Sequence, residues 1–426
     1  MSAAADYRIL DEAGLRRYLA GLPAVAARLG GAPSAWSIAE VGDGNLNLVF
    51  IVKGTTGGLV VKQALPYVRL VGESWPLPLS RSHYECLALR RQAVLAPDRV
   101  PAVFHQDEPL ALIVMQLLEP HIIMRKGLIA GTRYPRFVEH ISDFLSRTLF
   151  LTSDFALPAA EKKQGIAAFA GNSALCKITE DLIFTDPYRL AEQNRWTSPW
   201  LDDAAAGFRR DLDAHVAISR LKLKFLASPE ALIHGDLHTG SIMVTETDSQ
   251  IIDPEFAFYG PMGFDIGAVL SNLLMAYFAS AGHEDTHGAR RDFEHWVLET
   301  VEEVWTAFRR KFLGLWRHQA TGDAYPATLF ESADGAAALA AERDRYMDDL
   351  WRDTVGFSAA KIVRRILGLA HNADFETIAD TRSRAACEAR SLRLARRMLV
   401  ETSDFPTVGA VSEAARALRD WRPAFA

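Results

Sequence analysis

Apolar runs and alternating apolar positions place the strand signals within the first 120 residues. Residues 46–53 and 58–62 are apolar and rich in β-branched side chains, and the Gly-Thr-Thr-Gly-Gly segment between them has the composition of a hairpin turn. A third strand is predicted at residues 110–115, and residues 82–92 have the apolar spacing of a helix. This order predicts a small α+β unit, preceded by a helical segment at about residues 1–35.

The pattern becomes mostly helical after about residue 120. Amphipathic windows occupy residues 136–152, 204–227, 265–281, 289–317, 337–371 and 384–402. The one β interruption is a short hairpin formed by residues 242–244 and 250–252. The pattern therefore predicts an α+β protein with two lobes. A small β-rich lobe spans residues 1–118, and a large, mostly helical lobe spans residues 119–426, with the hairpin at the base of the cleft.

Composition limits the class of the protein and its partners. Of 426 residues, 49% are hydrophobic and 23% charged, as in ordinary globular proteins. The net charge of −6 argues against nucleic acid as a partner, because neutralising phosphates requires a basic face. We expect no membrane partner, since the start lacks a signal peptide and the apolar stretch near residues 267–281 is too short for a bilayer and should be a buried helix. Three widely spaced cysteines indicate a reducing cytoplasm.

Two acidic segments flank the hairpin, His-Gly-Asp-Leu-His at residues 234–238 and Ile-Asp-Pro-Glu at residues 252–255. Transfer of a phosphoryl group to a hydroxyl needs one carboxylate to orient and deprotonate the acceptor and others to hold Mg²⁺ on the phosphates of ATP. Asp236 suits the first task. Asp253 and Glu255 suit the second, because a strand ending in Asp-Pro-Glu would direct both side chains the same way. The alternative is a turn of capping aspartates without a catalytic role.

The first lobe adds candidates for binding ATP. In the loop before the first strand, Gly44 would allow the backbone to approach a phosphate, and Asn45 and Asn47 could donate amide hydrogens. Lys62 ends an apolar run and could reach the phosphates, with Glu85 on the following helix as the carboxylate that holds it in place. Each has a plain alternative. The loop could be an ordinary turn, Lys62 could extend into solvent from the strand end, and Glu85 could lie on a solvated helix face.

The connection after the third strand should lie between the lobes. Gln116, Leu117 and Leu118 could pair their backbone with the adenine edge, a placement that depends on the architecture alone. His234 and His238 raise the alternative of a zinc site. Because no third ligand is nearby and the chemistry calls for Mg²⁺, we expect His234 to fix the loop by hydrogen bonds instead.

These motifs resemble the aminoglycoside phosphotransferase and choline kinase superfamily, which has a protein-kinase-like fold. Its members share a loop of the form His-Gly-Asp-x-His-x-x-Asn and a later Ile-Asp-x-Glu metal motif; here Ser241 replaces the Asn. Within the superfamily the chain is similar to the 5-methylthioribose kinases from about residue 40 to 375. The segments that carry this similarity are residues 43–47, 73–77, 235–242, 253–265 and 364–371.

The resemblance implies a reaction and a set of site residues. These kinases use ATP and Mg²⁺ to phosphorylate the anomeric C1 hydroxyl of 5-methylthioribose, in methionine salvage. The sugar is implied at Asp236, Arg364 and Arg365, and the metal at Asp253 and Glu255. The cofactor site then comprises Gly44, Asn45, Lys62, Glu85, Gln116, Leu117, Leu118, Asp253, Pro254 and Glu255.

Several alternatives stay open at this point. Adjacent helical residues point about 100° apart, so Arg364 and Arg365 cannot both aim at one atom, and a basic stripe on a solvent-facing helix is the plain alternative. Ser241 leaves the number of metal ions open, and a homodimer is compatible with the resemblance. The acceptor could also be an aminoglycoside, choline or homoserine. A catalytically silent nucleotide-binding scaffold is the third reading, although intact Lys62 and Asp236 disfavour it.

Overall fold

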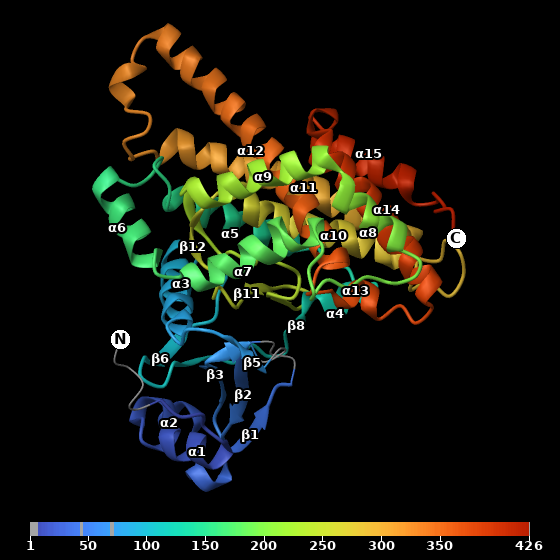
Figure 1. Cartoon of the computed structure of the whole chain (residues 1–426). Helices are drawn as coiled ribbons and strands as arrows, with labels where there is room; N and C mark the ends of the chain where they lie inside the picture. Colours follow the sequence, from blue (N-terminus) through green and yellow to red (C-terminus); the bar gives the residue numbers. More distant parts are fainter. Residues whose placement is uncertain (1–6, 43–45, 69–71, 426) are drawn as a thin grey trace.

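The computed structural model describes residues 7–42, 46–68 and 72–425 (Figure 1). In the first part of the chain, five antiparallel strands form one sheet in the order β1-β2-β3-β7-β6. Their bounds are Ser37–Glu40 for β1, Asn47–Lys53 for β2, Gly58–Ala64 for β3, Val103–Asp107 for β6 and Leu112–Gln116 for β7. The three expected strands are confirmed, and β1 and β6 complete the two edges.

Helices cover both faces of this sheet. The short helices α1 (Glu12–Ala20) and α2 (Pro23–Leu29) fall within the expected N-terminal helical segment, and their leucines pack with the sheet in one core. Helix α3 (Arg81–Leu95) corresponds to the helix predicted over residues 82–92, and it packs with the large core of the rest of the chain. A two-stranded ribbon, β4 (Tyr67–Val68) with β5 (Gly72–Pro76), precedes α3.

The remainder of the chain is mostly helical, as predicted. Its α-helices are α4 (Met124–Ile129), α5 (Phe137–Leu151), α6 (Ala159–Phe169), α7 (Ser173–Phe184), α8 (Asp202–Arg210), α9 (Leu212–Ala227), α10 (Met262–Ser280), α11 (Arg291–His318), α12 (Ala333–Leu367), α13 (Ala373–Glu376), α14 (Thr381–Val400) and α15 (Val408–Leu418). The window over residues 204–227 is two helices and not one. The reason is Asp211, whose side chain caps α9 by accepting from the backbone N–H of Ala214.

Short strands connect the two parts of the structure. The predicted hairpin is present as β10 (Ile242–Val244) and β11 (Ser249–Ile251), and β8 (Ile122–Ile123) joins it in a three-stranded sheet. A second pair, β9 (Ala231–Ile233) with β12 (Phe258–Gly260), was not expected. The chain thus leaves the five-stranded sheet at Gln116 and enters the hairpin sheet at Ile122. A lobe boundary near residue 118 remains a prediction.

Helix α10 is the centre of the helical part. By length and composition it could cross a membrane, so the expectation that this stretch is too short was wrong, but every residue of it is buried inside the protein, as expected of a core helix. Gly263 and Gly267 lie one turn apart on it and face α12. A Cβ at Gly267 would lie 2.9 Å from the backbone nitrogen of Ser358, so only glycine permits this close approach of the two helices. The approach determines where the last turns of α12 lie.

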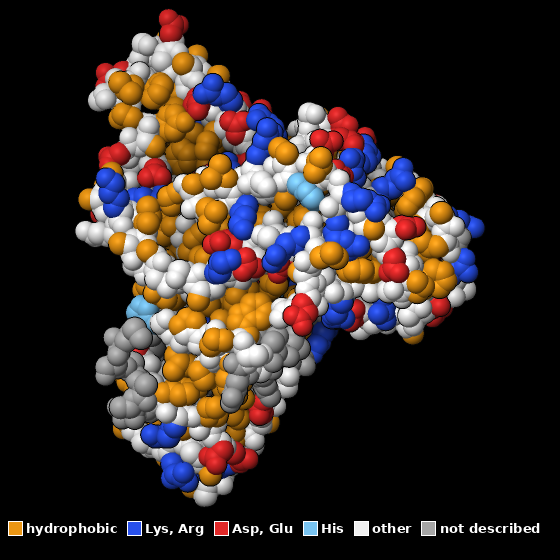
Figure 2. Space-filling view, viewed as in Figure 1, with side chains coloured by type: hydrophobic (Ala, Val, Ile, Leu, Met, Phe, Trp, Pro, Cys, Tyr) orange, Lys and Arg blue, Asp and Glu red, His pale blue; other side chains and the backbone are white. Residues whose placement is uncertain are grey.

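The outer surface carries charges of both signs. Figure 2 shows Lys and Arg side chains interspersed with Asp and Glu side chains over the face seen in Figure 1.

Candidate active site

The loop of residues 234–241 follows β9 and is held in one conformation from two sides. Gly235 has a φ of +84°, and a Cβ there would lie 2.2 Å from the carbonyl oxygen of Phe256, so the loop requires glycine at this position. Asp265, at the start of α10, accepts from the backbone N–H groups of His234 (2.6 Å) and Gly235 (3.0 Å). Nε2 of His234 lies 2.9 Å from the carbonyl oxygen of Ile252. The expected role of His234 in fixing the loop is confirmed, and Asp265 holds the loop from the other side.

Asp236 is surrounded by positive charge from α12. Lys361 donates to its Oδ1 at 3.1 Å, Arg364 lies 3.6 Å from Oδ1, and Arg365 lies 4.0 Å from Oδ2. Nε2 of His238 lies 3.5 Å from Oδ2. Burial alone would raise the pKa of Asp236, but the positive charge of Lys361 and of the two arginines outweighs it and holds that pKa well below its usual value. Asp236 is therefore an ionised carboxylate throughout the physiological pH range.

The two arginines lie at different atoms, as the helix geometry predicts, but on the same side chain. Both approach the same carboxylate, one at each oxygen, because a carboxylate offers two acceptors separated widely enough for neighbouring positions on one helix. Both side chains are buried, so neither belongs to a solvent-facing stripe. Among the residues described, Nε and Nη1 of Arg364 have no hydrogen-bond partner. A buried guanidinium with free donors is suited to bind an anionic group of a ligand.

Three carboxylates converge just after the end of β11. Glu85, Asp253 and Glu255 can place one oxygen each within 4.8 Å of one another. Asp253 has a φ of +69°, so the strand does not continue through it, and the alternation invoked for Asp253 and Glu255 was the wrong reason for their proximity. An all-oxygen set of this kind fits Mg²⁺, which prefers carboxylate ligands, better than zinc.

Lys62 stands in the middle of these carboxylates. Its Nζ lies 2.9 Å from Glu85, as expected, and it also makes a short contact with Asp253. Burial raises the pKa of Glu85, and the charges of Asp253 and Glu255 add to this, while Lys62 opposes them. Burial likewise raises the pKa of Glu255 against the influence of Lys62. Three carboxylates thus face two cations, Lys62 and, 3.7 Å from Glu255, Arg81, and a divalent cation would offset the remaining negative charge.

Two residues of the first lobe hold Glu255. Asn47 donates to Glu255 at 2.9 Å, and Nε of Arg81 lies 3.7 Å from the same carboxylate. Arg81, which is fully buried, also donates to Oδ1 of Asn47 at 3.0 Å. Asn47 was expected to present its amide to phosphate, but this amide is already engaged with Glu255. Arg81 was not predicted, and its place at the first turn of α3, four residues before Glu85, is the signal that could have identified it.

Other predicted positions are placed with less detail. Gly44 and Asn45 lie outside the described residues. Gln116 ends β7, while Leu117 and Leu118 follow it, and within the described chain the backbone of these two makes no hydrogen bond. Pro254 is buried between Asp253 and Glu255. The hydroxyl of Ser241 donates to the backbone oxygen of Asp236 at 3.1 Å, so it stabilises the loop.

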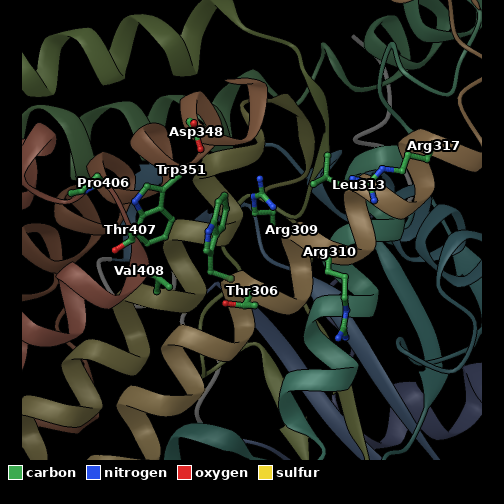
Figure 3. A pocket seen from close by; sticks show the side chains of 11 residues that line it. Thr306, Arg309, Arg310, Leu313, Arg317, Asp348, Trp351, Pro406, Thr407 and Val408 are labelled. Atoms are coloured by element: carbon green, nitrogen blue, oxygen red, sulfur yellow. The ribbon is translucent and has the colours of Figure 1, made fainter. Parts of the chain in front are cut away.

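A separate cavity of about 430 Å³ lies between α11, the middle of α12 and the start of α15. Figure 3 shows that its lining includes Trp351, Arg309 and Thr407. Arg309 is paired with Asp344 at 2.6 Å, and the cavity contains none of the candidate residues above.

Known families, proteins and solved structures include several that resemble this chain. A family model described as the phosphotransferase enzyme family matches residues 37–310. A solved choline/ethanolamine kinase family protein from Mesorhizobium loti is 14% identical, with a TM-score of 0.42, over 94% of this chain and 98% of that chain. Methylthioribose kinase 1 of Oryza sativa subsp. japonica is 48% identical, over 95% of this chain and 94% of that protein. Methylthioribose kinase of Escherichia coli O45:K1 is 43% identical, over 97% and 99% respectively.

Proposed function

Because this chain belongs to the phosphotransferase enzyme family and is related to methylthioribose kinases over most of its length, we propose that it is a methylthioribose kinase. It transfers the terminal phosphoryl group of ATP to the anomeric C1 hydroxyl of 5-methylthioribose, giving 5-methylthioribose 1-phosphate and ADP. The place of this reaction in methionine salvage and in the cytoplasm is part of the proposal. Three free cysteines, two of them buried, accord with a reducing compartment.

The substrate assignment is based on the positively charged side chains around Asp236. Lys361, Arg364 and Arg365 all lie within 4.0 Å of its carboxylate. An aminoglycoside or choline brings its own positive charge, which these side chains would repel at the acceptor position. A neutral sugar meets no such repulsion, and its hydroxyl can donate to Asp236. The geometry therefore favours a neutral acceptor over the cationic acceptors of related kinases.

ATP and Mg²⁺ are assigned to the carboxylate cluster on the same grounds of charge. Asp253 and Glu255 would hold the metal, which when bound neutralises charge on the phosphates. Lys62, kept in place by Glu85, would contact the phosphates directly. The backbone groups of Leu117 and Leu118, after Gln116, have no hydrogen-bond partner within the described ranges and could pair with adenine. Gly44 and Asn45 complete the proposed phosphate-binding loop, and Pro254 fixes the backbone between the metal ligands.

An ADP-release assay with four acceptors tests this proposal. Purified enzyme with Mg·ATP is offered 5-methylthioribose, ribose, choline and an aminoglycoside at equal concentrations. We expect the highest kcat/KM with 5-methylthioribose, weak activity with ribose, and none above background with the two cationic acceptors. Preference for choline or the aminoglycoside would refute the substrate assignment and leave the family assignment unaffected.

The two arginines give a prediction about catalysis. Replacing Arg364 or Arg365 singly with Ala should leave ATP affinity nearly unchanged and reduce turnover, because their charge acts on the transferring phosphoryl group or the sugar and not on adenine. Arg364→Ala should be the more severe, at about 10²-fold, since its Nε and Nη1 have no partner among the described residues, whereas Arg365 donates to the backbone oxygen of Ala370. Turnover at saturating sugar and ATP affinity measured by calorimetry check this. Full activity in both variants would contradict it.

The homodimer is assigned to an exposed apolar face of α9. Leu212, Val216, Leu223 and Leu226 are 54% to 73% exposed, although each is hydrophobic. They lie at −7, −3, +4 and +7 residues from the small Ser219, so the face is nearly symmetric about its own centre. Two antiparallel copies of α9 crossing at Ser219 would bring Leu212 of one copy opposite Leu226 of the other. A self-complementary patch of this kind suits a two-fold dimer.

A single charge on this face should separate the subunits. Leu223→Lys should shift the mass measured by light scattering from dimer to monomer, because it would bury two like charges near the crossing point. Leu190→Lys is the matched control, since Leu190 is 82% exposed and lies outside α9. A wild-type monomer, or an unchanged dimer in Leu223→Lys, would refute this interface.

A further inference from the structure

Lys361 is a buried lysine for which the sequence motifs give no role. It lies on α12, its side chain is only 3% exposed, and its Nζ is 4.1 Å from the centre of the Phe264 ring. Its Nζ donates to Oδ1 of Asp236 at 3.1 Å. An ammonium group removed from water to this extent is stable only where an anion compensates it, and Asp236 is that anion.

The hydrogen bond from Lys361 has no equivalent at this carboxylate. Arg364 and Arg365 lie 3.6 Å and 4.0 Å from Asp236, beyond hydrogen-bond distance. His238 lies 3.5 Å away. Within the described parts of the chain, Lys361 is thus the one side chain that donates a hydrogen bond to the carboxylate of Asp236. The arginines attract the carboxylate without fixing its orientation.

We infer that Lys361 is a positioning residue for the phosphoryl transfer: its ammonium holds Oδ1 of Asp236, so that Oδ2 faces the acceptor hydroxyl and the arginines remain available for the phosphoryl group. The inference rests on the proposed role of Asp236. In this arrangement the acceptor donates its hydrogen bond to a carboxylate whose rotation is already restricted. Such restriction raises the fraction of bound substrate that is correctly aligned.

The helix explains why one element can supply all three cations. Positions 361, 364 and 365 are spaced i, i+3 and i+4, so they lie on one face of α12. That face is brought to Asp236 because Gly267 of α10 allows the close approach of the two helices, and Ser358 donates to the carbonyl oxygen of Gly267 at 3.1 Å. The position of Lys361 is therefore fixed by backbone packing and not by a flexible side chain alone.

The surroundings of Lys361 make its charge sensitive to pH. Burial and the nearby arginines lower its pKa to about 8, although Asp236 opposes them. Below that pH Lys361 is protonated and donates to Asp236, and above it the neutral amine no longer anchors the carboxylate by charge. The charged or titratable groups that face it are Asp236 and His238 in the loop, Arg364 and Arg365 on α12, and Asp265 on α10. Burial and Arg125 keep the pKa of His238 well below its usual value, so His238 does not titrate in this range.

The test compares Lys361→Met and Lys361→Arg with the wild type, using ADP release with 5-methylthioribose from pH 6 to pH 10. Because kcat/KM reports ionisations of the free enzyme, the wild-type value should fall as pH rises through about 8. Lys361→Met should lower kcat/KM by about 10- to 100-fold at pH 7, the scale of a lost hydrogen bond to a charged group, and should abolish this alkaline limb. Lys361→Arg should keep most of the activity and move the limb to higher pH, because guanidinium stays protonated.

Lys224→Met is the matched control. Lys224 pairs with Asp353 of α12, so its loss removes another lysine to aspartate contact on the same helix without touching the loop. It should leave the pH profile unchanged.

The possible outcomes separate three cases. The inference is wrong if Lys361→Met keeps the wild-type rate and pH profile. It is also wrong if the variant loses activity equally at every pH and its Tm falls as much as that of Lys224→Met, because Lys361 would then be only structural. If Lys361→Met does not fold, Lys361→Arg decides, since an unmoved alkaline limb overturns the inference and a displaced one supports it. A wild-type enzyme inactive on 5-methylthioribose refutes the proposed function instead; the same variants are then compared with the best acceptor.

Discussion

Asp236→Asn should reduce turnover by about 10²-fold or more while ATP binding is largely retained. The substitution keeps the shape of the side chain but removes the negative charge that orients the acceptor hydroxyl and receives its proton. It also leaves Lys361, Arg364 and Arg365 without their shared counter-charge. The site then becomes more positive, so the affinity for the phosphates of ATP should be kept or increased. A loss of catalysis together with unchanged or tighter ATP binding is the signature of this role.

Stability must be measured with activity, because the same change leaves three buried cations uncompensated. Asp353→Asn is a suitable control, since Asp353 also pairs with a lysine on the helical framework but does not contact the loop. It should lower Tm with little effect on kcat. If Asp236→Asn retained near-normal turnover, Asp236 would not be the group that positions the acceptor.

The sequence predicts most of what local pattern determines. Residues 47–53 and 58–64 form strands because their apolar positions and the intervening glycines are local signals, and the pair of acidic motifs on a hairpin lies as expected. The pairing of Lys62 with Glu85 could be predicted because Lys62 lies on one predicted strand and Glu85 on the predicted helix that follows it. In each case a short segment carries its own information, through periodicity or turn chemistry.

What the sequence does not reveal depends on contacts between distant elements. Lys361 reaches Asp236, 125 residues earlier in the chain, only because α10 and α12 approach closely at Gly263 and Gly267. Arg81 reaches Glu255 through packing of the first lobe against the hairpin. Neither approach follows from a local motif. A positive φ at Asp253 is similarly invisible in the pattern, because Asp also occupies ordinary extended and helical conformations.

Asp253 is the residue whose loss should abolish activity. Both Asp253→Ala and Asp253→Asn remove one of the carboxylates that would hold Mg²⁺, and the phosphates would then lose the cation that neutralises their charge. Asn is the sharper variant. The φ of +69° strains Ala at this position, whereas Asn tolerates the left-handed region, so an inactive Asp253→Asn enzyme cannot be attributed to backbone strain.

Binding measurements distinguish a metal ligand from a residue that merely supports the fold. Asp253 contacts Lys62 in the structure, so removing it frees the ammonium for phosphate. Metal-free ATP should therefore bind Asp253→Asn as well as, or better than, the wild type, while Mg·ATP should bind at least about tenfold more weakly, or ~1.4 kcal/mol. Asp248→Ala is the matched control, because Asp248 lies five residues earlier on the same hairpin and pairs with Arg99 and His121. It should weaken neither form of ATP. Equal losses for Mg·ATP and metal-free ATP in calorimetry would show that Asp253 acts on the nucleotide or the fold, and not through the metal.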